Sequence, residues 1–233
     1  MNRGIPIVYR RALKAIGRSI THSVIPECGV ARWAFDEGNG TTAVDDWGTN
    51  DGQINDASYS YDSVVGSHSL SFDGSGDYVN IKDSIALDIT SDISLSIWVK
   101  TSNPNQGDNR LIDKSTDGTN EAYLLDLNSG CRLILDAGEI TTNSTIPPDL
   151  WTLVTATYDS STELARIYYD NAMQVEEMLS GSITANNNPV RIGTSPTDST
   201  KGYIGYLDDA RIYNKSLSIE EVNNLYTTGS ILG

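Results

Sequence analysis

The 233-residue sequence predicts an all-β fold, an antiparallel β-sandwich or jelly roll with one short C-terminal helix and an N-terminal arm. More than ten short apolar runs are separated by Gly, Asp, Asn and Ser, which is typical of strands joined by turns. A single segment carries strong helix-start signals, and the chain lacks the alternation of strands and long helices that accompanies a parallel sheet. We assign residues 1–29 to the arm and residues 30–233 to the sandwich.

The first strands are predicted at residues 31–35, 69–72, 78–81 and 93–100. The last of these is the clearest, because Ile93, Leu95, Ile97 and Val99 recur with a period of two and mark one buried face. The segment DGSGD at 73–77 contains two glycines that permit a positive φ. Strands 69–72 and 78–81 are therefore expected to be joined as in a hairpin.

Apolar runs predict the later strands at residues 110–114, 122–127, 132–135, 151–158, 164–169, 173–178, 190–193 and 203–213. Between two of them, Asp170 and Asn171 tolerate left-handed backbone geometry. Strands 164–169 and 173–178 should therefore pair as a hairpin.

A short helix is predicted at residues 219–226. Ser218 is a good N-cap, and Glu221 three residues later completes a capping box. Leu217 and Val222 are placed as a hydrophobic staple around this start. We expect this helix to close one end of the sandwich without forming a functional surface.

The charge of the chain is unevenly distributed. The formal net charge is −15, which disfavours nucleic acid as a partner because phosphate binding needs a basic surface. Residues 1–30 nevertheless contain five Lys or Arg residues and one acid. The arm is interpreted as an anchor onto a neighbouring copy or a larger structural assembly, or else as a flexible tail or leader.

Cysteine content and hydropathy limit the cellular context. Cys28 and Cys131 could form one disulfide or remain two free thiols. No stretch reaches the roughly 18 apolar residues of a membrane span. The N-terminus lacks the apolar core of an ordinary secretory signal.

Six segments give the chain a family resemblance: WAFDEGNGTT at 33–42, LSFDGSGDYVNI at 70–81, ISLSIWVK at 93–100, WTLVTATYD at 151–159, IYYDN at 167–171 and GYLDDARIYNKSLSIEEVNNLY at 205–226. In this order and spacing they resemble the LamG-like jelly-roll domains of the concanavalin A-like lectin/glucanase superfamily. The resemblance covers nearly all of the chain beyond the arm. It implies the fold more than the function, because this fold carries lectins, adhesion modules and hydrolases.

The resemblance implies that a cation is held between the early loops and the last strand. Calcium takes oxygen ligands from Asp, Asn and backbone carbonyls, and we predict Asp46, Asn50, Asp73 and Asp208 as its ligands. Asp208 and Asp209 should point to opposite faces of their strand, which leaves Asp209 to solvent or to Arg211. Alternatively, Asp73 and Asp208 simply accept hydrogen bonds from backbone N–H groups in tight turns.

Catalysis is not expected. Glucanases of the superfamily use a Glu-x-Asp-x-Glu strand whose carboxylates share one face, and that pattern does not occur in this sequence. The two histidines, His22 and His68, offer little material for a catalytic triad or a zinc site.

The function predicted is that of a non-catalytic recognition or adhesion module that binds a cell-surface or extracellular glycan. Trp47, Tyr123 and Asn187 are the candidate ligand-binding residues. An extracellular, cell-surface or virion location fits, such as a phage fibre or decoration protein anchored by residues 1–29. The alternatives are a purely structural virion or surface component without a glycan ligand, or an accessory domain of a secreted polysaccharide-degrading enzyme.

Overall fold

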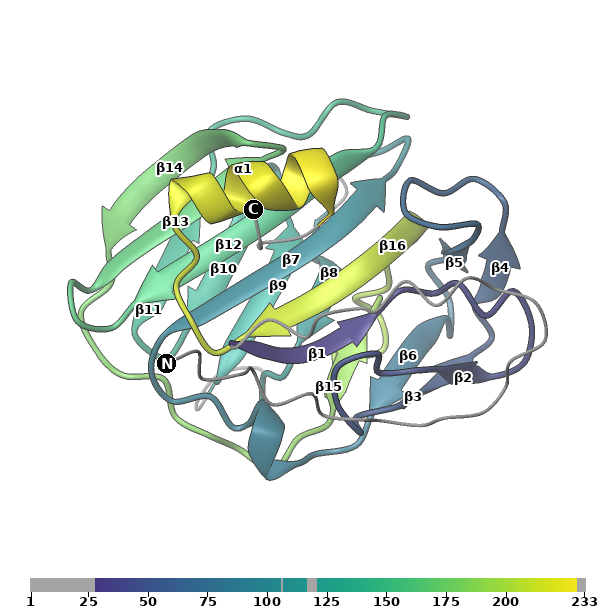
Figure 1. Ribbon diagram of the computed structural model, residues 1–233, viewed down its shortest axis with the longest axis horizontal. Helices are drawn as coiled ribbons and strands as arrows, with labels where there is room; N and C mark the ends of the chain where they lie inside the picture. The colour runs from purple at the N-terminus through teal and green to yellow at the C-terminus, as the bar shows by residue number, and fades with distance from the viewer. Residues whose placement is uncertain (1–27, 106, 117–120, 230–233) are drawn as a thin grey trace, which may run out of the picture.

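The computed structural model describes residues 28–105, 107–116 and 121–229. These residues form two eight-stranded sheets that lie face to face, with one α-helix on the outside (Figure 1). Every strand pair is antiparallel, so the predicted sandwich is confirmed.

Sheet A has the order β14-β13-β12-β7-β16-β5-β4, and β1 also pairs with β16. Its strands are β1 (Gly29–Trp33), β4 (Ser58–Ser60), β5 (Ser69–Asp73), β7 (Ile93–Lys100), β12 (Thr152–Asp159), β13 (Leu164–Tyr169), β14 (Ala172–Met178) and β16 (Ile204–Tyr213). Sheet B has the order β11-β10-β9-β8-β15-β6-β3-β2. Its strands are β2 (Thr42–Ala43), β3 (Gly52–Asn55), β6 (Tyr78–Ile81), β8 (Asn109–Asp113), β9 (Tyr123–Leu127), β10 (Cys131–Leu135), β11 (Gly138–Thr141) and β15 (Val190–Ile192).

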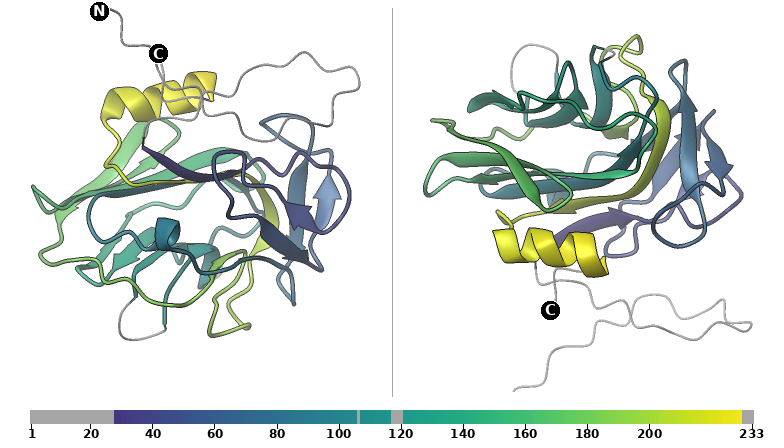
Figure 2. Two further views of the ribbon diagram at one scale, coloured as in Figure 1. Left: turned by 60° about the horizontal axis from the view of Figure 1, so that its bottom comes forward. Right: turned by 90° about the horizontal axis from the view of Figure 1, so that it is seen from above.

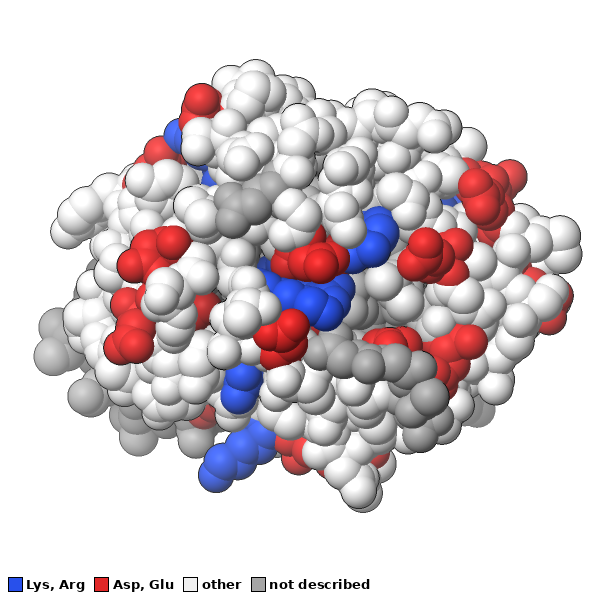
Figure 3. All heavy atoms as spheres, turned by 180° about the vertical axis from the view of Figure 1, so that it is seen from behind, with Lys and Arg blue, Asp and Glu red and all other residues white. Residues whose placement is uncertain are grey.

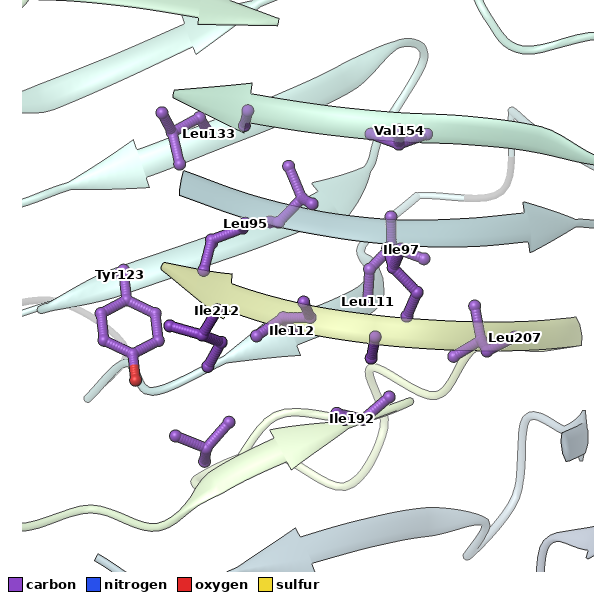
Figure 4. Packing of buried hydrophobic residues seen from close by; sticks show 14 of the residues in the cluster. Leu95, Ile97, Leu111, Ile112, Tyr123, Leu133, Val154, Ile192, Leu207 and Ile212 are labelled. Carbon is purple, nitrogen blue, oxygen red and sulfur yellow. The ribbon is translucent and has the colours of Figure 1, made fainter. Parts of the chain in front are cut away.

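The hydrophobic core fills the space between the sheets. Leu95 and Ile97 of β7 point inward from sheet A and meet Leu111 and Leu133 of sheet B (Figure 4). This inward set is the one that the period of two predicts for β7. The 3-10 helix η1 (Ile85–Leu87) adds a buried Leu87 to the same core.

The α-helix α1 (Ile219–Thr228) starts as predicted, since Ser218 and Glu221 form both hydrogen bonds of a capping box. It ends at Gly229, whose φ of 69° is left-handed. The expected position was wrong. Instead of closing one end, α1 lies on the outer face of sheet A, away from sheet B (Figure 2). Its Val222 and Leu225 join a second apolar cluster there, which we call the outer cluster: Trp47, Trp98, Leu153, Tyr168, Tyr213, Leu217, Val222 and Leu225.

Two hairpin predictions had opposite outcomes. The hairpin of β13 and β14 is confirmed, and Asp170 at its turn has a φ of 56°. The hairpin across residues 73–77 is wrong, because β5 belongs to sheet A and β6 to sheet B. This turn instead carries the chain from one sheet to the other.

Neither cysteine forms a disulfide: Cys131 lies in the core, and Cys28 packs against the outer cluster. No helix among the described residues is long and apolar enough to cross a membrane. The predicted arm lies almost entirely outside the described residues, so its role as an anchor stays a prediction.

Candidate functional site

Three of the four predicted calcium ligands are committed to other partners. Asp46 forms an ion pair of 3.0 Å with Arg32. The Oδ1 atom of Asn50 accepts a hydrogen bond from Ser84, and its amide nitrogen donates to Asp45. The 40–52 segment is thus held by hydrogen bonds and an ion pair.

Asp73 lies at the end of β5, where its Oδ1 atom accepts a hydrogen bond of 2.8 Å from the Ser75 N–H group. This is the turn role that was the alternative for Asp73. The described residues contain no group of three or more His, Cys, Asp or Glu side chains that could hold a metal ion. The four predicted ligands therefore do not assemble into one site.

Asp208 is different, because it is fully buried and only half satisfied. Its Oδ2 atom accepts hydrogen bonds from the N–H groups of Val64 (2.8 Å) and Val65 (2.9 Å). Within the described structure its Oδ1 atom has no hydrogen-bond partner. Burial raises the pKa of Asp208 to about 7. The hydrogen bonds from the two N–H groups act to lower this pKa, whereas the negative charges of Asp209 and Asp36 raise it further.

The N–H groups of Val64 and Val65 belong to a segment that we call the 62–68 loop. Asp36 holds the second half of this loop. Its Oδ1 atom accepts hydrogen bonds from the N–H groups of Ser67 (2.6 Å) and His68 (3.0 Å). The loop is thus fixed to the sandwich by two carboxylates, Asp208 on one side of Gly66 and Asp36 on the other. Sequence reasoning did not single out Asp36.

The prediction that Asp208 and Asp209 point to opposite faces is wrong. A β-bulge lies between Asp208 and Arg211, and Asp209 has a φ of 51°. The extra residue interrupts the alternation of side chains. Asp209 therefore contacts Arg32 (2.7 Å) and Arg211, in an ion-pair cluster beside the outer cluster. The predicted Asp209–Arg211 pair does form, with both side chains buried.

Two of the three predicted glycan-binding residues are buried. Trp47 packs against Tyr213 in the outer cluster, with 5.2 Å between ring centroids. Tyr123 is fully inside the core, where its hydroxyl donates to the Leu87 carbonyl. Neither ring presents a face to a ligand, because each completes an apolar cluster that the sequence alone did not show.

Asn187 is exposed at the tip of a turn. The backbone carbonyls on either side of it, from Asn186 and Asn188, accept hydrogen bonds from the buried Lys114 ammonium at 2.9 and 2.8 Å. Asp83 accepts a third hydrogen bond of 2.5 Å from the same group. The position of Asn187 is thus fixed by the neighbouring contacts, while its own side chain is available to a ligand.

A row of polar side chains crosses the outer face of sheet B. Gln53 of β3 lies opposite Asn80 of β6, Asn80 lies opposite Arg191 of β15, and Arg191 lies opposite Asp113 of β8. The row faces outward because the neighbours of Asn80 and Arg191 along their strands, such as Val79 and Ile192, point into the core. Amides and a guanidinium in register offer both hydrogen-bond donors and acceptors to one extended ligand.

An aromatic ring accompanies this row. Tyr78 is half-buried two residues before Asn80, and the Arg191 guanidinium lies 4.4 Å from the centroid of its ring. Alternation along β6 would have placed Tyr78 and Asn80 together on one face. The pairing with Arg191 is a long-range feature that sequence reasoning missed.

Beyond Asp113, a buried ionic cluster continues across the same face. Asp126 of β9 forms ion pairs with Nη1 of Arg110 and Nη2 of Arg132, each at 2.6 Å. Asp113 lies 3.2 Å from Nε of Arg110. Viewed from behind, basic and acidic side chains meet near the middle of this face (Figure 3). Guanidinium groups hold both carboxylates, so the cluster is suited to fixing the sheet and poorly suited to nucleophilic or acid–base catalysis.

A second aromatic surface lies on the outer face of sheet A. Asp62 accepts hydrogen bonds from Trp151 Nε1 (2.9 Å) and Lys100 Nζ (2.6 Å), which ties the 62–68 loop to the sheet. Next to it, Tyr61 is 87% exposed and its ring lies 4.7 Å from that of His68. This surface is the competing location for a ligand.

Comparison with known proteins identifies the fold. A family model described as the concanavalin A-like lectin/glucanases superfamily matches residues 73–223. No curated protein matches the chain. Among solved structures, similarity extends to domain 4 of AbnA, an extracellular arabinanase of family GH43 from Geobacillus stearothermophilus, in complex with arabinotriose. That match has a TM-score of 0.67 and 16% identity, and it covers 86% of this chain and 98% of that one.

Two toxin domains are also similar. One is the binding domain of Paraclostridial Mosquitocidal Protein 1, with a TM-score of 0.67, 15% identity and coverage of 87% of this chain and 52% of that one. The other is the ligand-binding domain of botulinum neurotoxin serotype D in complex with N-acetylneuraminic acid, with a TM-score of 0.64, 14% identity and coverage of 85% and 50%. The chain thus spans about half the length of these toxin domains. At identities this low, the structural similarity establishes a shared fold and does not establish a shared function.

Proposed function

The chain belongs to the concanavalin A-like lectin/glucanase superfamily, and from this premise we propose that it is a non-catalytic, extracellular glycan-binding module. The observation that carries the proposal is the polar row on the outer face of sheet B. Gln53, Asn80 and Arg191 are in register there, and Tyr78 lies beside them. Sugar hydroxyls pair with amide and guanidinium groups, and the apolar face of a sugar ring packs on an aromatic side chain.

The comparisons support this proposal in one respect. Two of the similar domains were solved with a carbohydrate, and others are named as binding domains. The fold is therefore one on which glycan recognition occurs, although recognition has to be argued from each site.

We expect Tyr78→Ala to raise the Kd for a bound glycan about 30-fold, which is the loss of about 2 kcal/mol typical of a central aromatic contact. A glycan array would first identify ligands of the wild-type chain, and calorimetry would then compare the variants. Tyr61→Ala is the matched control, because it removes an exposed tyrosine that directly follows β4 of the opposite sheet. Loss of glycan binding in Tyr61→Ala, with binding retained in Tyr78→Ala, would show that the ligand binds on the outer face of sheet A.

The same assays separate the alternatives. Signals that stay at background on the array would favour a purely structural virion or surface component. Release of products from a bound polysaccharide would contradict the non-catalytic assignment. We further propose that residues 1–29 attach the domain to a larger assembly such as a phage or virus particle. The charge contrast between this arm and the acidic remainder of the chain supports that role.

We also propose that the domain binds calcium, with Asp208 as the ligand from the last strand. A buried carboxylate oxygen without a hydrogen-bond partner is costly unless a cation accompanies it. Asp36, whose charge acts on Asp208, would be the second carboxylate. Asp46, Asn50 and Asp73 are not part of this proposal, because at least one side-chain oxygen of each already has another partner.

Calcium at 100-fold above its Kd is expected to stabilise the wild-type chain by about 2.7 kcal/mol. For a domain of this size, this corresponds to an increase in Tm of about 5–10 °C. Asp208→Asn should abolish the increase, because the amide still accepts the two loop hydrogen bonds but lacks the charge. Asp46→Asn is the control and should retain the increase. Equal responses of Asp208→Asn and the wild type in calorimetry would rule out Asp208 as a ligand.

A further inference from the structure

One arginine of the sheet B face has no acidic partner. Five of the six arginines that the structure describes form ion pairs with carboxylates: Arg32, Arg110, Arg132, Arg166 and Arg211. Arg191 makes no ion pair with any described residue, although the chain carries a net charge of −15. An unpaired guanidinium in so acidic a protein requires an explanation.

The nearest carboxylate along the row is directed elsewhere. Asp113 lies opposite Arg191 in the strand register. Its Oδ1 atom accepts a hydrogen bond of 2.6 Å from Ser115, and its Oδ2 atom lies 3.2 Å from Nε of Arg110. The sheet therefore brings an acid beside Arg191 without neutralising it.

The guanidinium of Arg191 is held in place by three contacts. It lies over the Tyr78 ring, its Nε donates to Asn80 Oδ1 at 3.2 Å, and its Nη1 donates to the Ser195 carbonyl at 3.1 Å. All three partners are uncharged, so they orient the group and leave its charge uncompensated. The Nη2 atom makes no hydrogen bond to the described residues and remains available to a ligand. An arginine that is already ordered loses little entropy when it binds an anion.

From this arrangement we infer that Arg191 recognises the carboxylate of an acidic sugar, so that the sheet B face selects carboxylated glycans over neutral ones. The inference rests on the proposed glycan-binding function and specifies its ligand class. The planar fork of a guanidinium matches a carboxylate. The adjacent amides of Asn80 and Gln53 would pair with hydroxyls of the same or the next sugar residue. Because one cation lies on an acidic protein, a single carboxylate per recognised sugar fits better than a polyanion.

The test compares a glycan that carries a uronate or sialate with its carboxyl-reduced, neutral counterpart. The strongest carboxylated ligand on an array of acidic and neutral glycans is used for this pair. We expect the wild type to bind the acid about 10- to 100-fold more tightly than the reduced form, the range for a charge-assisted hydrogen bond. Arg191→Gln should make the two affinities equal. Arg191→Lys, which keeps the charge without the fork, should retain part of the preference.

Arg166→Gln is the matched control, since it removes the same charge from a surface ion pair on sheet A and should leave the preference unchanged. Circular dichroism and urea unfolding check that each variant is folded. Equal binding of both forms by the wild type, a preference that persists in Arg191→Gln, or array binding restricted to neutral glycans would overturn the inference and leave the proposed function standing. If no glycan binds, the proposed function fails and the inference fails with it.

Discussion

Replacement of Asp209 by asparagine is expected to lower the free energy of unfolding by about 3 kcal/mol or more, the usual cost of breaking a buried ion pair from one side. Asp209 is 2% exposed and contacts two guanidinium groups, Arg32 at 2.7 Å and the equally buried Arg211. The substitution removes the charge that compensates both cations. Asparagine tolerates the positive φ at this position, so backbone strain does not add to the effect.

The pH dependence of stability should report the same cluster. Burial acts to raise the pKa of Asp209, but Arg211 and Arg32 outweigh burial and hold the pKa below its ordinary value. A carboxylate with a lowered pKa in the folded state contributes stability above its unfolded pKa, near 3.9. That contribution is lost as the pH falls through the folded pKa. The difference in stability between the wild type and Asp209→Asn should therefore shrink in strongly acidic buffer.

Asp46→Asn is the matched control, because Asp46 pairs with the same Arg32 from a partly exposed position. Exposed ion pairs contribute about 0–1 kcal/mol, so this variant should differ little from the wild type. Urea unfolding at neutral pH measures both changes. Similar small effects for the two substitutions would show that the buried cluster contributes no more than a surface ion pair.

The direction of the Asp209 side chain could not be predicted from the sequence. Strict alternation assigned Asp208 and Asp209 to opposite faces, and it would also put Leu207 and Ile212, five residues apart, on opposite faces, yet both point into the core. The bulge changes the assignment because it inserts one residue between them. A residue other than glycine at a positive φ gave no sequence signal. Which carboxylates face the outer layer is therefore a property of the strand pairing.

The elements with strong local signals were predictable. Strands such as β7 have a clear period of two, and α1 has its cap, capping box and staple within a few residues. The strands β2, β3, β4 and β11, of two to four residues, were missed because so few positions do not establish a period. The separation of β5 and β6 into two sheets depends on partners far along the chain.

The candidate site was less predictable than the fold. Trp47 lies in a polar stretch that favoured exposure, yet Tyr213 and Arg211, more than 160 residues away, cover its ring. The polar row depends on the register between β3, β6 and β15, which only the folded sheet defines. At the candidate site, residue types could be read from the sequence, whereas the burial of Trp47 and the neighbours in the polar row could not.

Replacement of Lys114 by methionine is expected to lower the free energy of unfolding by about 3 kcal/mol, because removal of the buried ammonium would leave several oxygen atoms without a donor. Its Nζ atom donates to Asp83 and to the carbonyls of Asn186 and Asn188, and Asp88 lies 3.4 Å away. Methionine fills nearly the same volume, so the change isolates the charge and its hydrogen bonds from packing. The two carboxylates are partly exposed, which keeps the expected cost at the lower end of the range for buried ion pairs.

Lys82→Met is the matched control for this prediction. Lys82 is exposed next to Asp83, and the substitution removes the same charge from the same region of the chain. Urea unfolding should place this variant within about 0.5 kcal/mol of the wild type. Hydrogen exchange adds a local measure, since the amides of the 186–188 turn should lose protection in Lys114→Met alone. Comparable stabilities of the two variants, with the turn still protected, would mean that the carbonyls and carboxylates around Lys114 are satisfied without its ammonium.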